Sequence, residues 1–133
     1  MAECSSLVGI PFLFGGRTLA GLDCWGLVME AFRMRGIEVE DVSDYGALAA
    51  AEVSPQIASA CAETWRQVEE PYEPYDVLLF SEGTSGAVTH CALYLGNGRM
   101  LHTTQRTGAV ITRVRSYVHR FAGAWRREAL CLA

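Results

Sequence analysis

The 133-residue sequence contains no lysine, and all eleven of its basic residues are arginines. Fifteen acidic residues give a formal net charge of −4, which argues against nucleic acid as a partner because phosphate binding needs a basic surface. Residues 7–14 form an apolar run too short for a transmembrane helix, and Glu3 stands where a signal peptide carries positive charge. We therefore expect no membrane partner and a chain made in the cytoplasm without an export route of its own.

The sequence also lacks the cysteine spacing of a disulfide framework or a zinc site. Its five cysteines are odd in number, widely spaced and never arranged as Cys-x-x-Cys. We expect no metal and no other cofactor. The cysteines expected to be ordinary small residues, buried or at the surface, are Cys4, Cys61, Cys91 and Cys131.

Half of the residues are hydrophobic, and the length suits one domain with a real core, so residues 1–133 are expected to form a single domain. A helical N-terminal half followed by short antiparallel strands predicts an α+β fold with a sheet of about five or six strands. A short helix or arm is expected at 1–8, a loop at 9–21, and two short helices at 44–51 and 55–64. Strands are expected at 65–68, 76–81, 88–95, 99–104, 109–115 and 123–129, with a turn at 117–121.

The most informative stretch runs from Asp23 to Val28 and reads Asp-Cys-Trp-Gly-Leu-Val. Aspartate favours a helix N-cap, and apolar residues follow at helical spacing, so we predict a helix from Cys24 to about Arg35 that ends at Gly36. The partial positive charge at a helix N-terminus favours the thiolate, which is the nucleophilic form of cysteine. Cys24 is therefore the candidate catalytic nucleophile.

Two of the three histidines, His90 and His102, fall in neighbouring predicted strands. A two-residue loop, Asn97-Gly98, would place them on opposite faces of the sheet. A three-residue loop that begins at Gly96 makes Leu95 the last paired residue and brings His102 diagonally beside His90. We predict the second register, in which the two rings come within reach of a hydrogen bond.

This arrangement supplies the three parts of a thiol hydrolase: Cys24 as nucleophile, His90 as base and His102 as the residue that orients His90. Ala92 lies on the same strand face as His90 and is small enough to let a helix approach. Two alternatives remain open. The histidines could form a cross-strand contact with no catalytic role, or join the cysteine in a zinc site, for which a fourth ligand with sensible spacing is missing. His119 has no matching partner and is expected at the surface.

These residues resemble the NlpC family of papain-like cell-wall cysteine peptidases, over roughly residues 9–128. The resemblance implies one papain-like domain, no cofactor, and cleavage of peptidoglycan stem peptides, typically between γ-D-glutamate and a diamino acid. It also implies that Cys24, His90 and His102 are the nucleophile, base and third member. The matching segments are an aromatic-Gly-Gly run at 12–16, Asp-Cys-x-Gly-Leu-Val at 23–28, a less well matched Gly-Asp-hydrophobic strand at 74–80, and a His-x-small-hydrophobic-Tyr-Leu-Gly-x-Gly-x-x-hydrophobic-His block at 90–102.

Two positions depart from the family pattern. Many members carry a tyrosine twelve residues before the nucleophile, whose hydroxyl helps bind the oxyanion, but Phe12 stands there. Loss of one oxyanion donor typically costs roughly a hundred- to a thousandfold in rate. Trp25 replaces a serine that, with the preceding aspartate, recognises the free amine of the peptide in many members, and Asp23 keeps its carboxylate for that task. Arg17 either meets a substrate carboxylate or is a solvated loop arginine.

The Asp-Cys-Trp-Gly-Leu variant, with a short insert containing Asp44 and Tyr45, is most similar to proteins of phage tail modules. That similarity implies a tail component that the virion carries to the bacterial cell wall, with other tail-tip proteins as partners. Two further hypotheses remain. One is a weakly active or inactive tail-assembly protein that keeps the fold, for which Phe12 is the main support. The other is an amidase or acyltransferase that uses the same triad on a different substrate.

Overall fold

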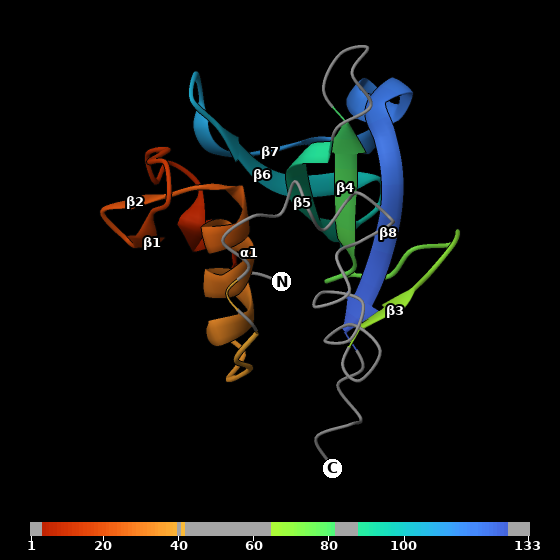
Figure 1. The fold of residues 1–133 in the computed structure, drawn as a ribbon, viewed down its shortest axis with the longest axis horizontal. Coiled ribbons are helices and arrows are strands. Elements are labelled where there is room, and N and C mark those ends of the chain that lie inside the picture. The colour runs from red at the N-terminus through yellow and green to blue at the C-terminus, as the bar shows by residue number, and fades with distance from the viewer. Residues whose placement is uncertain (1–3, 40, 42–64, 82–87, 128–133) are drawn as a thin grey trace.

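Within the residues that the computed structural model describes, one α-helix lies beside a twisted six-stranded antiparallel sheet (Figure 1). The structure describes residues 4–39, 41, 65–81 and 88–127, so the helices expected at 44–51 and 55–64 lie outside the described residues. The described elements are η1 (Cys4–Leu7), β1 (Arg17–Thr18), β2 (Gly21–Leu22), α1 (Cys24–Arg33), β3 (Trp65–Gln67), β4 (Val77–Ser81), β5 (Val88–Gly96), β6 (Arg99–Thr104), β7 (Gly108–Arg113), η2 (Val114–Arg120) and β8 (Phe121–Arg127). The α+β class and the six strands of the sheet were both predicted.

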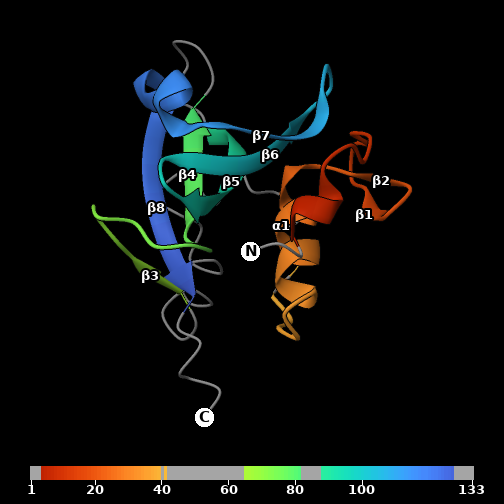
Figure 2. The same cartoon turned by 180° about the vertical axis from the view of Figure 1, so that it is seen from behind.

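The strand order is β3-β8-β4-β5-β6-β7, so the last strand of the described chain lies between β3 and β4. Figure 2 shows β8 running along β4, with α1 and the small β1–β2 sheet on the other side of the molecule. In the described part of the chain, no helix has the length and apolar character needed to cross a membrane.

Helix α1 begins at Cys24 because Asp23 has an extended backbone and its side chain accepts a hydrogen bond from the Gly26 backbone. The apolar residues that follow Cys24 at helical spacing are all buried, namely Leu27, Val28, Ala31 and Phe32. Near its end, the backbone N–H of Gly36 donates to the Arg33 carbonyl at 2.8 Å, and Gly36 has a positive φ of 79°. The α-helix therefore ends at Arg33, two residues before the predicted end, and Gly36 stops the chain from continuing it.

The sheet is buried on both faces where β4 and β5 pair, because successive residues point to opposite sides. We expected Ala92 to face the helix, and this was wrong: Ala92 packs in the cluster on the other face, with residues such as Phe80. The residues packed with α1 on the near face are Val77, Leu79, Cys91, Leu93 and Leu101.

The β5–β6 hairpin has the predicted register but reaches it by a different turn. Leu93 pairs with Leu101, as the prediction required, and Gly96 then pairs with Arg99. The turn is therefore Asn97-Gly98, two residues with positive φ angles of 56° and 74°. The predicted three-residue loop was wrong. A bulge at Leu95 absorbs the extra residue, and it preserves the register that the histidines need.

Candidate active site

Cys24 is the first residue of α1 and is only 2% exposed. The preceding Asp23 caps the helix: its Oδ1 accepts a hydrogen bond of 2.7 Å from the Gly26 N–H. The N-cap and the position of Cys24 in the first turn were both predicted. The backbone N–H groups at a helix start carry partial positive charge, which favours a thiolate at this cysteine.

The side chain of Cys24 contacts that of Cys91 on β5, and the two thiols share a hydrogen bond. Burial, followed by this contact with Cys24, raises the pKa of the Cys91 thiol well above its ordinary value. Cys91 therefore stays protonated and is the S–H donor of the pair. We had expected a small residue here, buried or at the surface, and Cys91 is buried, but its contact with Cys24 was not predicted. Its place next to His90 in the sequence was the signal that could have revealed it.

The predicted ring-to-ring hydrogen bond between the two histidines is confirmed. Nε2 of His90 lies 2.8 Å from Nδ1 of His102 on the neighbouring strand. Nε2 of His102 lies 3.0 Å from the hydroxyl of Thr112 on β7, so a single polar chain crosses three strands. Among the described contacts, Nδ1 of His90 takes part in none, and it is the nitrogen left to exchange a proton with a thiol.

Burial lowers the pKa of His102 to about 4, with the nearby charges of His90 and Arg120 adding to the effect. His102 is therefore neutral at neutral pH and has one N–H donor and one acceptor. When His90 becomes an imidazolium, its Nε2–H must donate to His102 Nδ1. The proton of His102 then resides on Nε2, where it donates to Thr112. Such a chain of hydrogen bonds is what an orienting residue needs in order to hold the His90 ring, and the catalytic role of His102 stays a prediction.

Tyr117 on η2 borders both histidines, and no motif or spacing in the sequence pointed to it. Its ring is stacked near that of His90, with centroids 6.2 Å apart, and meets the ring of His102 edge-on at 5.0 Å. Phe80 lies 6.1 Å from His90, so the base candidate is enclosed by aromatic rings. His119 on the same segment is exposed, as predicted.

The candidate nucleophile and the histidines reach β5 at successive residues and from different faces. Cys24 meets the strand at Cys91, on the face covered by α1. His90 is the preceding residue, and its aromatic neighbours Phe80 and Tyr117 belong to the cluster on the opposite face. The pairing of β4 with β5 shifts by one residue here, between Phe80 and Ser81. The three triad candidates thus gather at the irregular first end of β5.

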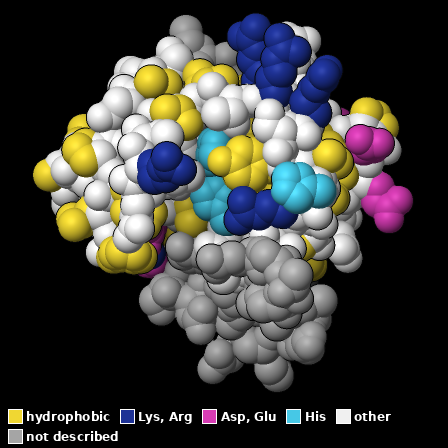
Figure 3. Space-filling model, turned by 90° about the horizontal axis from the view of Figure 1, so that it is seen from above, with side chains coloured by type: hydrophobic (Ala, Val, Ile, Leu, Met, Phe, Trp, Pro, Cys, Tyr) yellow, Lys and Arg dark blue, Asp and Glu magenta, His cyan; other side chains and the backbone are white. Residues whose placement is uncertain are grey.

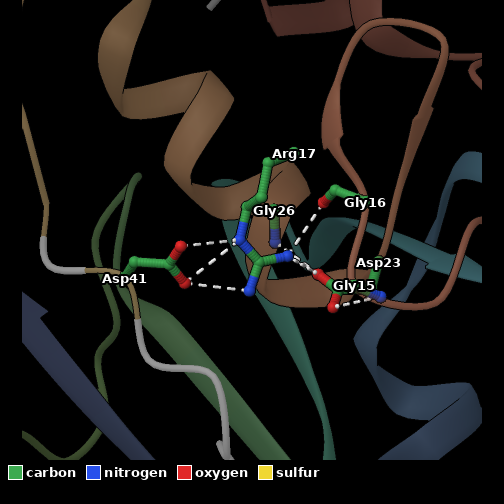
Figure 4. A network of polar contacts seen from close by, with 6 residues as sticks. All are labelled: Gly15, Gly16, Arg17, Asp23, Gly26 and Asp41. Atoms are coloured by element: carbon green, nitrogen blue, oxygen red, sulfur yellow. Dashed lines mark hydrogen bonds and ion pairs between the residues drawn. The ribbon is translucent and has the colours of Figure 1, made fainter.

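Arg17 is not a solvated loop arginine, and that alternative was wrong. Its Nη1 contacts Asp23 Oδ1 at 2.6 Å, and its Nη2 contacts Asp41 Oδ1 at 2.9 Å (Figure 4). The second carboxylate oxygen of Asp23 accepts a hydrogen bond from the Gly15 N–H at 3.2 Å. Both oxygens of Asp23 are therefore occupied by groups of the chain itself. The substrate-binding roles of Asp23 and Arg17 stay predictions.

The hairpin formed by β1 and β2 holds this network against the start of α1. It lies inside the segment we expected to be a loop, so these two short strands were missed. A Cβ atom on Gly26 would overlap the Gly16 carbonyl, and one on Gly16 would overlap the Gly21 carbonyl. Only glycine permits so close a backbone approach at these two positions.

The two departures from the family pattern lie in different surroundings. Trp25 is only 3% exposed, and its ring lies 6.1 Å from that of Trp65, so it is part of the core. Phe12 is half-buried, forms a β-bridge with Leu22, and meets the ring of Phe14 edge-on at 4.9 Å. Their roles in substrate binding stay predictions. Within the described residues, no group of three or more His, Cys, Asp or Glu side chains is placed to hold a metal ion.

Comparison with known proteins assigns this fold and motif set to a family. The model of the NlpC/P60 family matches residues 9–126, and the chain belongs to this family. A γ-DL-glutamyl hydrolase of Bacillus subtilis is 34% identical over 116 residues, which cover 84% of the chain and 24% of the hydrolase. The chain thus spans about a quarter of the length of this relative.

Solved structures confirm the papain-like NlpC/P60 fold. An NlpC/P60 family protein from Bacillus cereus superposes with a TM-score of 0.70 at 24% identity, covering 95% of this chain and 38% of that one. RipD from Mycobacterium tuberculosis superposes with a TM-score of 0.66 at 19% identity, covering 96% of this chain and 92% of that one. RipD is described as a non-catalytic NlpC/P60 domain protein adapted to peptidoglycan binding. The fold alone is therefore compatible with both catalysis and binding.

Proposed function

We propose that this chain is a cysteine peptidase domain that cleaves peptidoglycan stem peptides at the bond between γ-D-glutamate and a diamino acid. The observation that carries the proposal is the 2.8 Å bond between His90 and His102, together with the contact of Cys24, at a helix N-terminus, with Cys91, the residue after His90 on β5. This bond holds His90 by Nε2 and leaves Nδ1 for the nucleophile.

The reaction begins when the Cys24 thiol gives its proton to His90 Nδ1 and the thiolate attacks the scissile carbonyl carbon. The oxyanion that forms is stabilised by the backbone N–H of Cys24, and His102 accepts the hydrogen bond from the imidazolium of His90. His90 then protonates the leaving amine, and a thioester forms on Cys24. Water, deprotonated by His90, hydrolyses the thioester and regenerates the thiol.

The substrate part of the proposal is supported by the motif resemblance and by the similarity to the B. subtilis relative, a γ-DL-glutamyl hydrolase. The decisive experiment incubates purified protein with peptidoglycan and identifies the released peptides by mass spectrometry. We expect fragments with a newly formed γ-D-glutamate terminus, and none from Cys24→Ala. Equal release by this variant would rule out the mechanism.

A second candidate function is peptidoglycan binding without catalysis. The observation in its favour is Phe12, which offers no hydroxyl to the oxyanion, together with the retention of this fold in the non-catalytic RipD. On this alternative, the protein sediments with insoluble peptidoglycan but releases nothing from it. Cys24→Ala then sediments to the same extent as the unaltered chain.

We further propose that the chain acts as part of a phage tail and carries its activity to the cell wall. The support is the tryptophan that follows the nucleophile, together with the insert containing Asp44 and Tyr45, which lies outside the described residues. Mass spectrometry of purified virions from a lysogen that encodes the chain tests this directly. Its absence from intact particles would contradict the tail assignment.

A further inference from the structure

Arg120 brings a fixed positive charge to the same end of the sheet as the histidine pair. It is the last residue of η2, the segment whose Tyr117 contacts both histidine rings. Its Nε donates a hydrogen bond of 2.9 Å to the Ser81 carbonyl, and the Ser81 hydroxyl donates one of 3.3 Å to the Arg120 carbonyl. These reciprocal bonds tie the arginine to the end of β4.

The guanidinium of Arg120 remains available for an anion. Its Cζ lies 5.4 Å from the centre of the Tyr117 ring, and its charge reaches His102 strongly enough to help lower the pKa of that residue. Across the described residues, Arg120 makes no ion pair, whereas Arg17 and Arg126 are each paired with an aspartate. Figure 3 shows arginine, histidine and hydrophobic side chains side by side on this face.

We propose that Arg120 binds a substrate carboxylate next to the scissile bond and thereby favours γ-glutamyl substrates whose α-carboxylate is free. A guanidinium held through Nε presents its two Nη groups, which suit the two oxygens of a carboxylate. Glutamate linked through its side chain keeps a free α-carboxylate, which the α-carbon and two methylene groups separate from the scissile carbonyl. A peptide bond that follows a residue without an acidic side chain has no carboxylate there. This inference rests on the proposed function and identifies Arg120 as the residue that binds the carboxylate.

Arg120 is better placed than Arg17 to bind a substrate carboxylate, because the two arginines differ in their partners. The guanidinium of Arg17 is shared between Asp23 and Asp41, so a substrate carboxylate would have to displace a carboxylate of the chain. Arg120 requires no such exchange. Arg115 provides a matched control, because it lies in the same segment but is exposed.

The experiment compares two synthetic γ-D-glutamyl peptides that differ only in the α-carboxylate, which is free in one and converted to a carboxamide in the other. Their binding to Cys24→Ala is measured by calorimetry, and their kcat/KM with the catalytic chain is measured separately. A charge-assisted pair is worth enough to make the carboxylate peptide bind about tenfold or more tightly. Arg120→Gln should erase this preference and Arg120→Lys should retain part of it, while Arg115→Gln should leave it unchanged.

Three outcomes would overturn the inference: equal binding of both peptides by Cys24→Ala, an undiminished preference in the chain with Arg120→Gln, or no binding of either peptide. A circular dichroism spectrum shows whether the Arg120 variants are folded. The proposed function can fail while the inference about Arg120 holds. If Cys24→Ala discriminates between the peptides but the unaltered chain cleaves neither, then Arg120 recognises a carboxylate in a protein that binds the peptide without hydrolysing it.

Discussion

Replacing Asp23 by alanine removes the contacts that connect the start of α1 to the preceding hairpin. The change deletes the 2.7 Å cap to Gly26, the 3.2 Å bond from Gly15 and the 2.6 Å ion pair with Arg17. The side chain of Asp23 is only 9% exposed and that of Arg17 is 24% exposed, so water only partly replaces these partners. Two backbone donors and one guanidinium lose an acceptor together.

The expected cost follows from these contacts. Loss of an N-cap costs about 1 kcal/mol, and loss of a hydrogen bond to a charged group costs about 1.5–3 kcal/mol. We therefore expect Asp23→Ala to lower the free energy of unfolding by about 3 kcal/mol. Asp23→Asn keeps the acceptor for Gly26 but loses the charge, so it should cost about half as much. Asp41→Ala should cost less than about 1 kcal/mol, because Asp41 is 52% exposed.

Urea unfolding followed by circular dichroism measures all three variants. With a slope of about 2 kcal/mol per molar urea, Asp23→Ala should lower the midpoint by about 1.5 M. The order Asp23→Ala, Asp23→Asn, Asp41→Ala, from largest to smallest effect, is the essential result. A loss in Asp41→Ala as large as that in Asp23→Ala would refute the reasoning.

Three other predictions concern the residues around the triad. The pKa of His102 falls from 6.5 to about 4 on folding, so the unfolded chain binds more protons below pH 6.5. Stability should therefore drop by up to about 3 kcal/mol as the pH falls from neutral to 4, and His102→Gln should flatten that part of the urea-unfolding profile. Cys91→Ala removes an S–H donor from Cys24 and should shift the alkylation of Cys24 to higher pH; an unchanged profile would show that Cys91 does not act on the nucleophile. Phe12→Tyr supplies an oxyanion donor and should raise the rate of stem-peptide cleavage by about tenfold or more, and a slower enzyme would contradict this.

The hairpin that carries the histidines shows what the sequence could predict. Alternation along the strands and the Asn97-Gly98 turn signal limited the register to two choices, and the favoured choice brought His90 and His102 together. The detail of the turn could not be predicted, because a bulge and a longer loop add the same one residue. Both solutions therefore give the same register for the histidines.

The surroundings of the triad depend on contacts between distant segments and were less predictable. Short strands such as β1 and β2 have no periodicity of their own and are held by close glycine contacts. Arg17 gains its second carboxylate partner only when Asp41 comes alongside, 24 residues away in the chain. Tyr117 reaches the histidines, and Arg120 follows it, because η2 leads into β8, which pairs with β4 rather than with its neighbours in sequence. Propensity and spacing carry no information about such contacts.

The central claim is that His90 forms a working pair with Cys24. The most direct measurement is the pH dependence of iodoacetamide alkylation at Cys24, followed by mass spectrometry of the labelled peptide in the unaltered chain and in His90→Ala. An ordinary thiol titrates near a pKa of about 8.5. We predict that the reactivity of Cys24 persists well below that pH in the unaltered chain and returns to the ordinary profile in His90→Ala. The same profile in both proteins would contradict the account.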